Sequence, residues 1–109
     1  GAAKQSPEPA AADHPLETQI RAACREAALT PGDFVTALGG YGSWLIGIDH
    51  GGHSARLVWN GKDGRLVLQR ALPAGGWEDL RECPVTEVNG TGFAAAIRLL
   101  ATAGTTAGP

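Results

Sequence analysis

The fold is decided by residues 43–72, which read SWLIGIDHGGHSARLVWNGKDGRLVLQRAL. Gly51-Gly52 suits the positive φ angles of a two-residue hairpin turn, and residues 61–64 suit a connection built on a type I turn. These turns separate three runs that are rich in apolar and β-branched residues, as is typical of strands: Ser43–His50, His53–Asn60 and Arg65–Leu72. The stretch therefore predicts an antiparallel meander.

The two turns also predict the register of the strands. If His50 faces His53 across the first turn, Trp44 faces Trp59. If Asn60 faces Arg65 across the second turn, Trp59 faces Leu66 in the same way. Together the turns place one set of apolar residues on one face: Trp44, Ile46, Ile48, Ala55, Leu57, Trp59, Leu66 and Leu68. A slip of one residue in either hairpin would break this set, because neighbouring side chains in a strand point to opposite faces.

Helical spacing flanks the meander on both sides. From about His14 to Leu29 an apolar stripe recurs at helical intervals, and it consists of Leu16, Ile20, Ala23, Cys24 and Ala27. A second helix is expected from about Thr91 to Thr102, with Phe93, Ile97 and Leu100 on one face. The predicted fold class is α+β: a two-layer sandwich with a three- or four-stranded antiparallel meander and two long helices packed on one face.

Two segments allow more than one interpretation. Thr30-Pro31-Gly32-Asp33 has the cap and proline of a helix start, which favours a short helix ending at Gly39-Gly40. The alternative is a strand over Phe34–Leu38, where apolar residues alternate. Further along, Trp77–Cys83 is expected to form a short helical turn, and Pro84–Val88 a fourth strand at the edge of the sheet.

One domain is expected, over residues 14–102. Residues 1–13 contain proline, alanine and charge without a large apolar side chain, and residues 103–109 are similar. Such segments cannot offset the entropy lost on ordering, so both are expected to be disordered tails.

Composition argues against several function classes. The net charge is −2, from nine Lys and Arg against eleven Asp and Glu, and no two cations are adjacent, so we expect no nucleic-acid partner. No apolar run is long enough to span a bilayer. Two cysteines, Cys24 and Cys83, favour free thiols in a reducing compartment, with a single disulfide as the alternative. No signal peptide is visible, and a cytoplasmic location is expected.

The second face of the meander is the main candidate site. The predicted register places Leu45, Val58 and Val67 side by side there, flanked by Arg56 and Gln69. If both helices pack on the other face, this apolar stripe is left open, as in many protein contacts. If another element covers it, the stripe belongs to the core.

A second candidate site is the hairpin tip His50-Gly51-Gly52-His53. The register puts the two imidazoles across from each other, roughly 5 Å apart at Cβ, where both can reach one Zn²⁺ or Ni²⁺. A metal needs further ligands, and Asp49 is expected to point to the opposite face. Cys24 or Cys83 could supply one, although the sequence does not fix their distance from the histidines. The alternative is a turn that merely ends in two polar residues.

Other motifs give little support to catalysis. Gly39-Gly40-Tyr41-Gly42-Ser43 lacks the Lys and Thr of a phosphate-binding loop, and Asn89-Gly90-Thr91-Gly92 is explained by a self-capping helix start. No serine lies in a nucleophile elbow, and Glu78, Asp79 and Glu82 suit a solvated helix face. We expect no enzyme activity and no cofactor.

The order of elements is similar to that of small acidic type III secretion chaperones: a helix, a meander, a short helix, an edge strand and a helix. This resemblance implies a chaperone-like adaptor. The sequence therefore predicts a non-catalytic module that binds another protein, including a second copy of itself, through the open sheet face. The alternative is a small metal- or ligand-binding protein that uses the His50/His53 rim.

Overall fold

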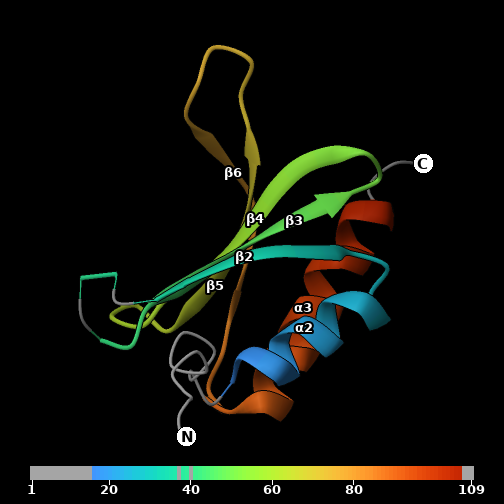
Figure 1. Ribbon diagram of the computed structural model, residues 1–109. Helices are drawn as coiled ribbons and strands as arrows, with labels where there is room; N and C mark the ends of the chain where they lie inside the picture. The colour runs from blue at the N-terminus through green and yellow to red at the C-terminus, as the bar shows by residue number, and fades with distance from the viewer. Residues whose placement is uncertain (1–15, 37, 40, 107–109) are drawn as a thin grey trace, which may run out of the picture.

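The computed structural model describes residues 16–36, 38–39 and 41–106, and its architecture is α+β (Figure 1). Along the chain the elements are helix α2 (Glu17–Glu26), strands β2 (Thr30–Thr36), β3 (Trp44–His50), β4 (His53–Asn60), β5 (Arg65–Ala71) and β6 (Trp77–Pro84), and helix α3 (Gly90–Thr106). The strands form one five-stranded sheet in the order β2-β3-β4-β5-β6, and all neighbouring pairs are antiparallel. The predicted meander is confirmed, with more strands than expected.

The predicted register is confirmed in both central hairpins. His50 pairs with His53 and Trp44 with Trp59 across β3 and β4, and Asn60 pairs with Arg65 across β4 and β5. Both central residues of the first turn have positive φ, 63° and 85°, which glycine adopts without strain. The apolar set that the turns predicted is buried on one face of the sheet.

The predicted short helix after Thr30 is wrong, because this segment is the edge strand β2. The alternative strand was nearer, but it was placed too late, at Phe34–Leu38. Phe34 lies opposite Ile46, and its ring centroid is 5.5 Å from that of Trp44. The register shifts between Pro31 and Phe34, which marks a bulge. Packing of Phe34 against the core therefore outweighs the capping pattern of the sequence.

The predicted helical turn over Trp77–Cys83 is also wrong, because this segment forms the other edge strand, β6. Of the predicted strand Pro84–Val88, only Pro84 belongs to β6. Every residue of the strand is exposed except Cys83, so the sequence has none of the alternation that reveals a half-buried strand. Two ion pairs to β5 accompany the backbone pairing: Arg70–Glu78 at 2.7 Å and Arg65–Glu82 at 3.5 Å.

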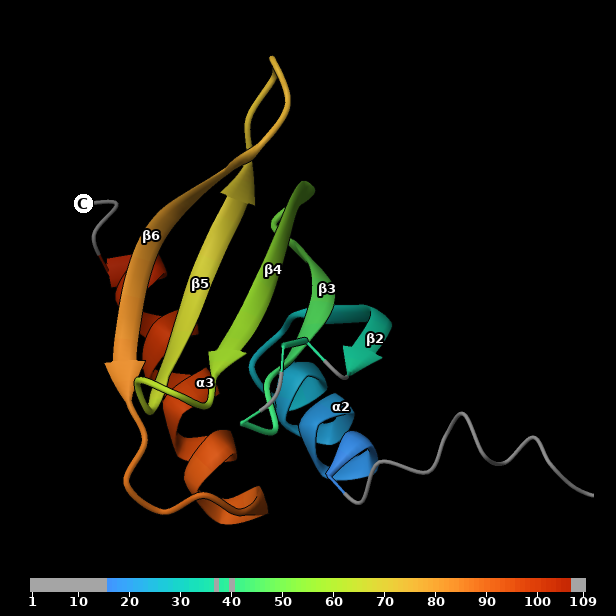
Figure 2. The ribbon, with the colours of Figure 1, turned by 90° about the vertical axis from the view of Figure 1, so that its left-hand side faces the viewer.

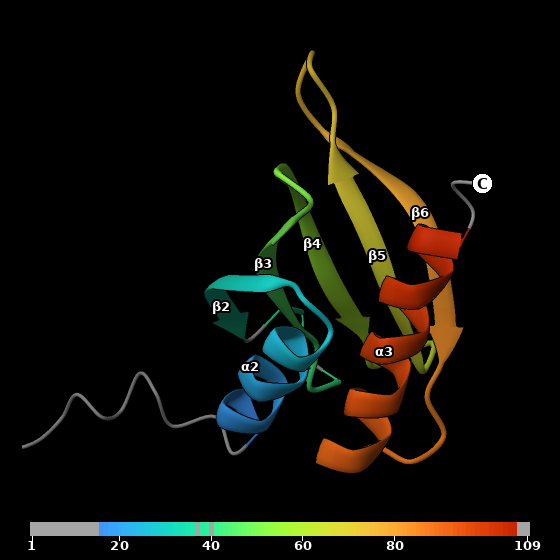
Figure 3. The same ribbon diagram turned by 90° about the vertical axis from the view of Figure 1, so that its right-hand side faces the viewer.

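Both helices cover the same face of the sheet, as predicted. In Figure 2, β5 and β6 lie in front of α3, whereas Figure 3 shows α2 and α3 side by side in front of the sheet. Helix α2 is shorter than the predicted His14–Leu29, of which residues 14 and 15 lie outside the described part of the chain. Helix α3 continues to Thr106, past the predicted end at Thr102. The predicted tail at 1–13 and residues 107–109 also lie outside the described residues.

An aromatic cluster joins the sheet to α3. The ring of Phe93 meets Trp44 and Trp59 edge-on, with centroids 5.2 Å and 4.9 Å apart. Both tryptophans and Phe93 are buried, and the indole N–H of Trp44 has no hydrogen-bond partner within the described residues. Since buried aromatic rings remove large apolar areas from water, this contact contributes strongly to the packing of the two layers.

We expect Trp59→Ala to lower the free energy of unfolding by about 3–5 kcal/mol, because it leaves a cavity beside Phe93. Trp77→Ala is the matched control: it makes the same change at a site that is 39% exposed, and should cost about 1 kcal/mol or less. Urea unfolding of both variants measures the difference. Equal losses would contradict the packing described above.

Candidate functional site

The open face of the sheet has an apolar row that runs across four strands. Val35, Leu45, Val58 and Val67 are successive partners on β2, β3, β4 and β5, and Glu82 of β6 ends the row. Val35 is 41% exposed and the other three side chains are half-buried. The sequence predicted Leu45, Val58 and Val67, but missed Val35 because that residue was expected in a helix. We call these four residues the apolar row.

A polar chain of contacts runs beside the apolar row. Nε of Arg56 donates a hydrogen bond to Oε1 of Gln69 at 2.7 Å, and Nε2 of Gln69 donates to Oδ1 of Asp79, also at 2.7 Å. The guanidinium carbon of Arg56 lies 4.1 Å from the ring centroid of Trp77, within the range of a cation–π contact. Arg56 and Gln69 therefore lie where the sequence placed them, on the flank of the row.

The charges on this face are largely matched within it. Arg56 is linked to Asp79 through Gln69, and Arg65 pairs with Glu82 at 3.5 Å. These pairs are exposed or half-buried, so each stabilises the fold only weakly. Because of these pairs, however, neither positive nor negative charge is in strong excess along the border of the apolar row. Trp77 and Asp79 were missed by sequence reasoning because the segment that carries them was expected to be helical.

The predicted His50/His53 pair is brought together, but without a third metal ligand. The two histidines are cross-strand partners at the β3–β4 tip, whereas Asp49 pairs with Ser54 and is exposed on the opposite face of the sheet. Within the described residues, no group of three or more His, Cys, Asp or Glu side chains could hold a metal ion. Cys24 and Cys83, the candidates for a further ligand, do not join the pair, and both are free thiols.

The two glycine-rich segments, before β3 and at the start of α3, each form hydrogen bonds within the chain. Ser43 Oγ accepts a hydrogen bond from the Gly61 N–H at 3.0 Å, which holds the loop before β3 against the β4–β5 turn. A Cβ at position 61 would run into the carbonyl of Tyr41, so this close approach requires glycine. Asn89 Oδ1 accepts from the Gly92 N–H at 2.8 Å and caps α3, as the sequence indicated.

The acidic cluster is divided between the two sides of β6, since the segment is not helical. Glu78 pairs with Arg70 at 2.7 Å, and Asp79 accepts from Gln69 on the open face. The other candidate for chemistry, Cys24, is a residue of α2 and is fully buried. Burial raises the pKa of this thiol from 9.0 to about 11, an increase that the charges of Arg21 and Arg25 partly oppose. A thiol in this environment is a poor nucleophile.

Comparisons with known proteins give no match: no family model, no curated protein and no solved structure is similar to this chain. Neither of the helices in the described part of the chain has the length and apolar character to cross a membrane. The class that the fold defines is therefore a small α+β domain with helices on one face of its sheet.

The raised pKa of Cys24 predicts how stability depends on pH. The unfolded chain releases the thiol proton near pH 9.0, whereas the folded protein keeps it up to about pH 11. The protonated thiol therefore contributes fully to the free energy of unfolding below pH 9.0. This contribution is lost as the pH rises toward 11. Urea unfolding across this range should show a loss that Cys24→Ala lacks and the control Cys83→Ala retains. The same loss in Cys24→Ala would contradict this assignment.

Proposed function

We propose that this protein is a non-catalytic interaction domain whose open sheet face packs against a second copy of the chain. The observation that carries the proposal is the apolar row Val35–Leu45–Val58–Val67, which is continuous across four strands and lies opposite the helix-covered face. Two-layer domains of this kind bury one sheet face internally, and an apolar row on the other face favours packing against a further layer.

Charge matching favours a second copy as the partner. Because Arg56, Asp79, Arg65 and Glu82 are linked among themselves, a partner needs no excess of opposite charge. An identical face meets this requirement, since it presents the same apolar row and the same internally matched border. Two such sheets would stack face to face about 10 Å apart, with the helices on the outside.

The size of the face sets the expected affinity. Five strands about 4.8 Å apart and seven or eight residues long cover roughly 20 Å by 25 Å, or about 500 Å². A standard interface buries about 800 Å² on each partner, so the dimer should be weak and concentration-dependent. The proposal is therefore a reversible dimer with a dissociation constant of roughly micromolar or weaker.

We expect Val58→Glu to abolish dimerisation, because it buries a charge without a counter-ion at the centre of the apolar row. The fold should survive with a loss of about 1 kcal/mol, since Val58 is only half-buried. Leu99→Glu is the matched control: it adds the same charge at a 61% exposed position on α3, away from the sheet face. Sedimentation equilibrium over a range of concentrations measures the mass, and circular dichroism checks the fold.

Each outcome bears on the proposal. A wild-type protein that stays monomeric at high concentration would show that a second copy is not the partner, and would make a different protein the next candidate. Dimers that persist in folded Val58→Glu would move the interface elsewhere. If Val58→Glu unfolds, Val35→Lys at the 41% exposed end of the row replaces it, with the same expected loss of dimer.

A further inference from the structure

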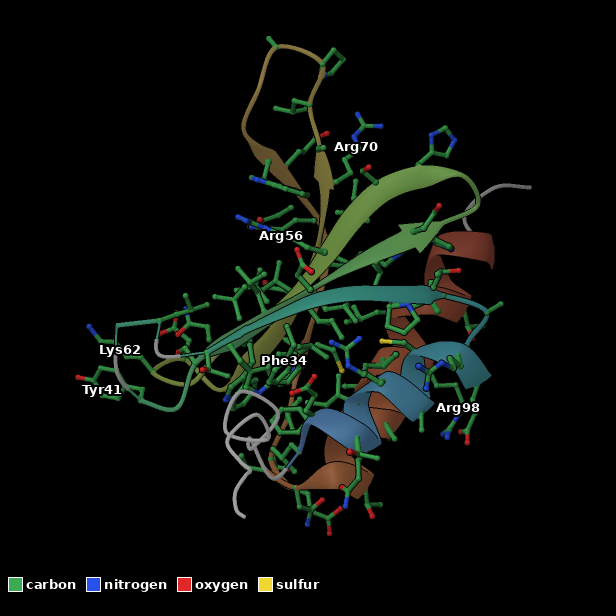
Figure 4. The ribbon with its side chains drawn as sticks, in the orientation of Figure 1. Phe34, Tyr41, Arg56, Lys62, Arg70 and Arg98 are labelled. Carbon is green, nitrogen blue, oxygen red and sulfur yellow. The ribbon has the colours of Figure 1, made fainter. Side chains whose placement is uncertain are left out.

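A cavity of about 460 Å³ lies between the β3–β4 and β5–β6 hairpins. Its polar lining includes His50, His53 and Arg70, and its apolar lining includes Ala55, Pro73 and Leu80. The register places His50, Ala55 and Arg70 on the face opposite to the apolar row. Figure 4 shows Arg70 and Arg56 on opposite sides of the sheet. Ser54 and Ala71 also line the cavity, and the register places them on the face of the apolar row. The cavity therefore lies at the end of the sheet and shares no residue with the apolar row.

The bulge in β6 supplies one apolar wall of this cavity. Arg81 pairs with Leu68 and Asp79 with Gln69, so the register passes over Leu80. A bulge redirects a side chain out of the normal alternation, and here Leu80 lines the cavity while remaining 45% exposed. An exposed leucine beside Pro73 gives the cavity an apolar wall that the fold itself does not require.

The polar lining consists of three side chains with N–H donors and the hydroxyl of Ser54. The imidazoles of His50 and His53 come from one hairpin, and the guanidinium of Arg70 comes from the other; no carboxylate side chain lines the cavity within the described residues. Nε of Arg70 donates to Oε1 of Glu78 at 2.7 Å, which uses one of the five N–H donors of a guanidinium. The others can hold a second carboxylate.

We propose that this cavity binds a small organic carboxylate, with the carboxylate group on Arg70 and the His50/His53 pair and the apolar body against Leu80 and Pro73. Arginine and imidazole N–H groups are preferred partners of carboxylates, and the volume lies in the range of small-molecule sites. Glu78 competes with the ligand for Arg70. This site stands independently of the proposed dimer.

The test is a titration of the ¹⁵N-labelled protein with hexanoate, followed by amide NMR. We expect saturable shifts at His53, Ala55 and Ala71, and none with hexylammonium, which has a similar alkyl chain and the opposite charge. Arg70→Gln should weaken binding about tenfold by removing a charge-assisted hydrogen bond. Glu78→Gln should strengthen it, because the competing carboxylate is gone. Arg98→Gln, which removes a cation from α3, is the matched control and should change nothing.

Several results would overturn the carboxylate site. They are the absence of shifts with hexanoate, equal shifts with hexylammonium, or affinities that Arg70→Gln and Glu78→Gln leave unchanged. Shifts at His50 and His53 with Zn²⁺ but none with hexanoate would replace it with a metal site. The titration is repeated on Val58→Glu, where binding should persist; this separates a failure of the carboxylate site from a failure of the dimer.

Discussion

The contact of Phe93 with two tryptophans is the interaction on which the rest of the structure depends. Phe93 lies in the first turn of α3, and its ring meets Trp44 of β3 and Trp59 of β4 edge-on. The two indoles are cross-strand partners, so one helical side chain is packed against both strands of the central hairpin. Edge-to-face contacts have preferred directions, unlike simple burial, and this contact therefore fixes where α3 crosses the sheet.

Covering one face with both helices leaves the two faces of the sheet with different roles. The covered face contains Ile46, Leu57 and Leu66, which are fully buried. On the other face the apolar row is only partly shielded by its own neighbours, and Arg56 is held in place by Gln69 and Trp77. A side chain on that face can therefore be substituted with less effect on the core than a side chain on the covered face.

The sequence predicted the centre of the fold well and its borders poorly, for a physical reason. In β3, β4 and β5 one side of each strand is buried, so alternation and the two glycine-containing turns determine the register together. In β6 almost every residue is exposed, and in β2 a bulge interrupts the alternation. Neither edge strand carries the pattern by which a half-buried strand is recognised.

The same division applies to the candidate sites. Leu45, Arg56, Val58, Val67 and Gln69 lie on central strands, and the sequence placed them on one face. Val35, Trp77 and Asp79 lie on the edge strands and were missed. The cavity brings Arg70 and Leu80 together with the two histidines only because the β5–β6 hairpin extends beside the β3–β4 hairpin. The bulge that directs Leu80 toward the cavity depends on backbone pairing, which local sequence does not reveal.

The two irregular edges have a consequence for assembly. Pro31 of β2 has no N–H to donate, and the bulge beside it distorts the strand. At the opposite edge, β6 has its own bulge, ends at Pro84 and is rich in charged side chains. A further strand therefore finds no straight, complete hydrogen-bonding template at either side. Growth of the sheet into a filament by strand addition is therefore disfavoured, and the proposed face-to-face contact would give a closed dimer.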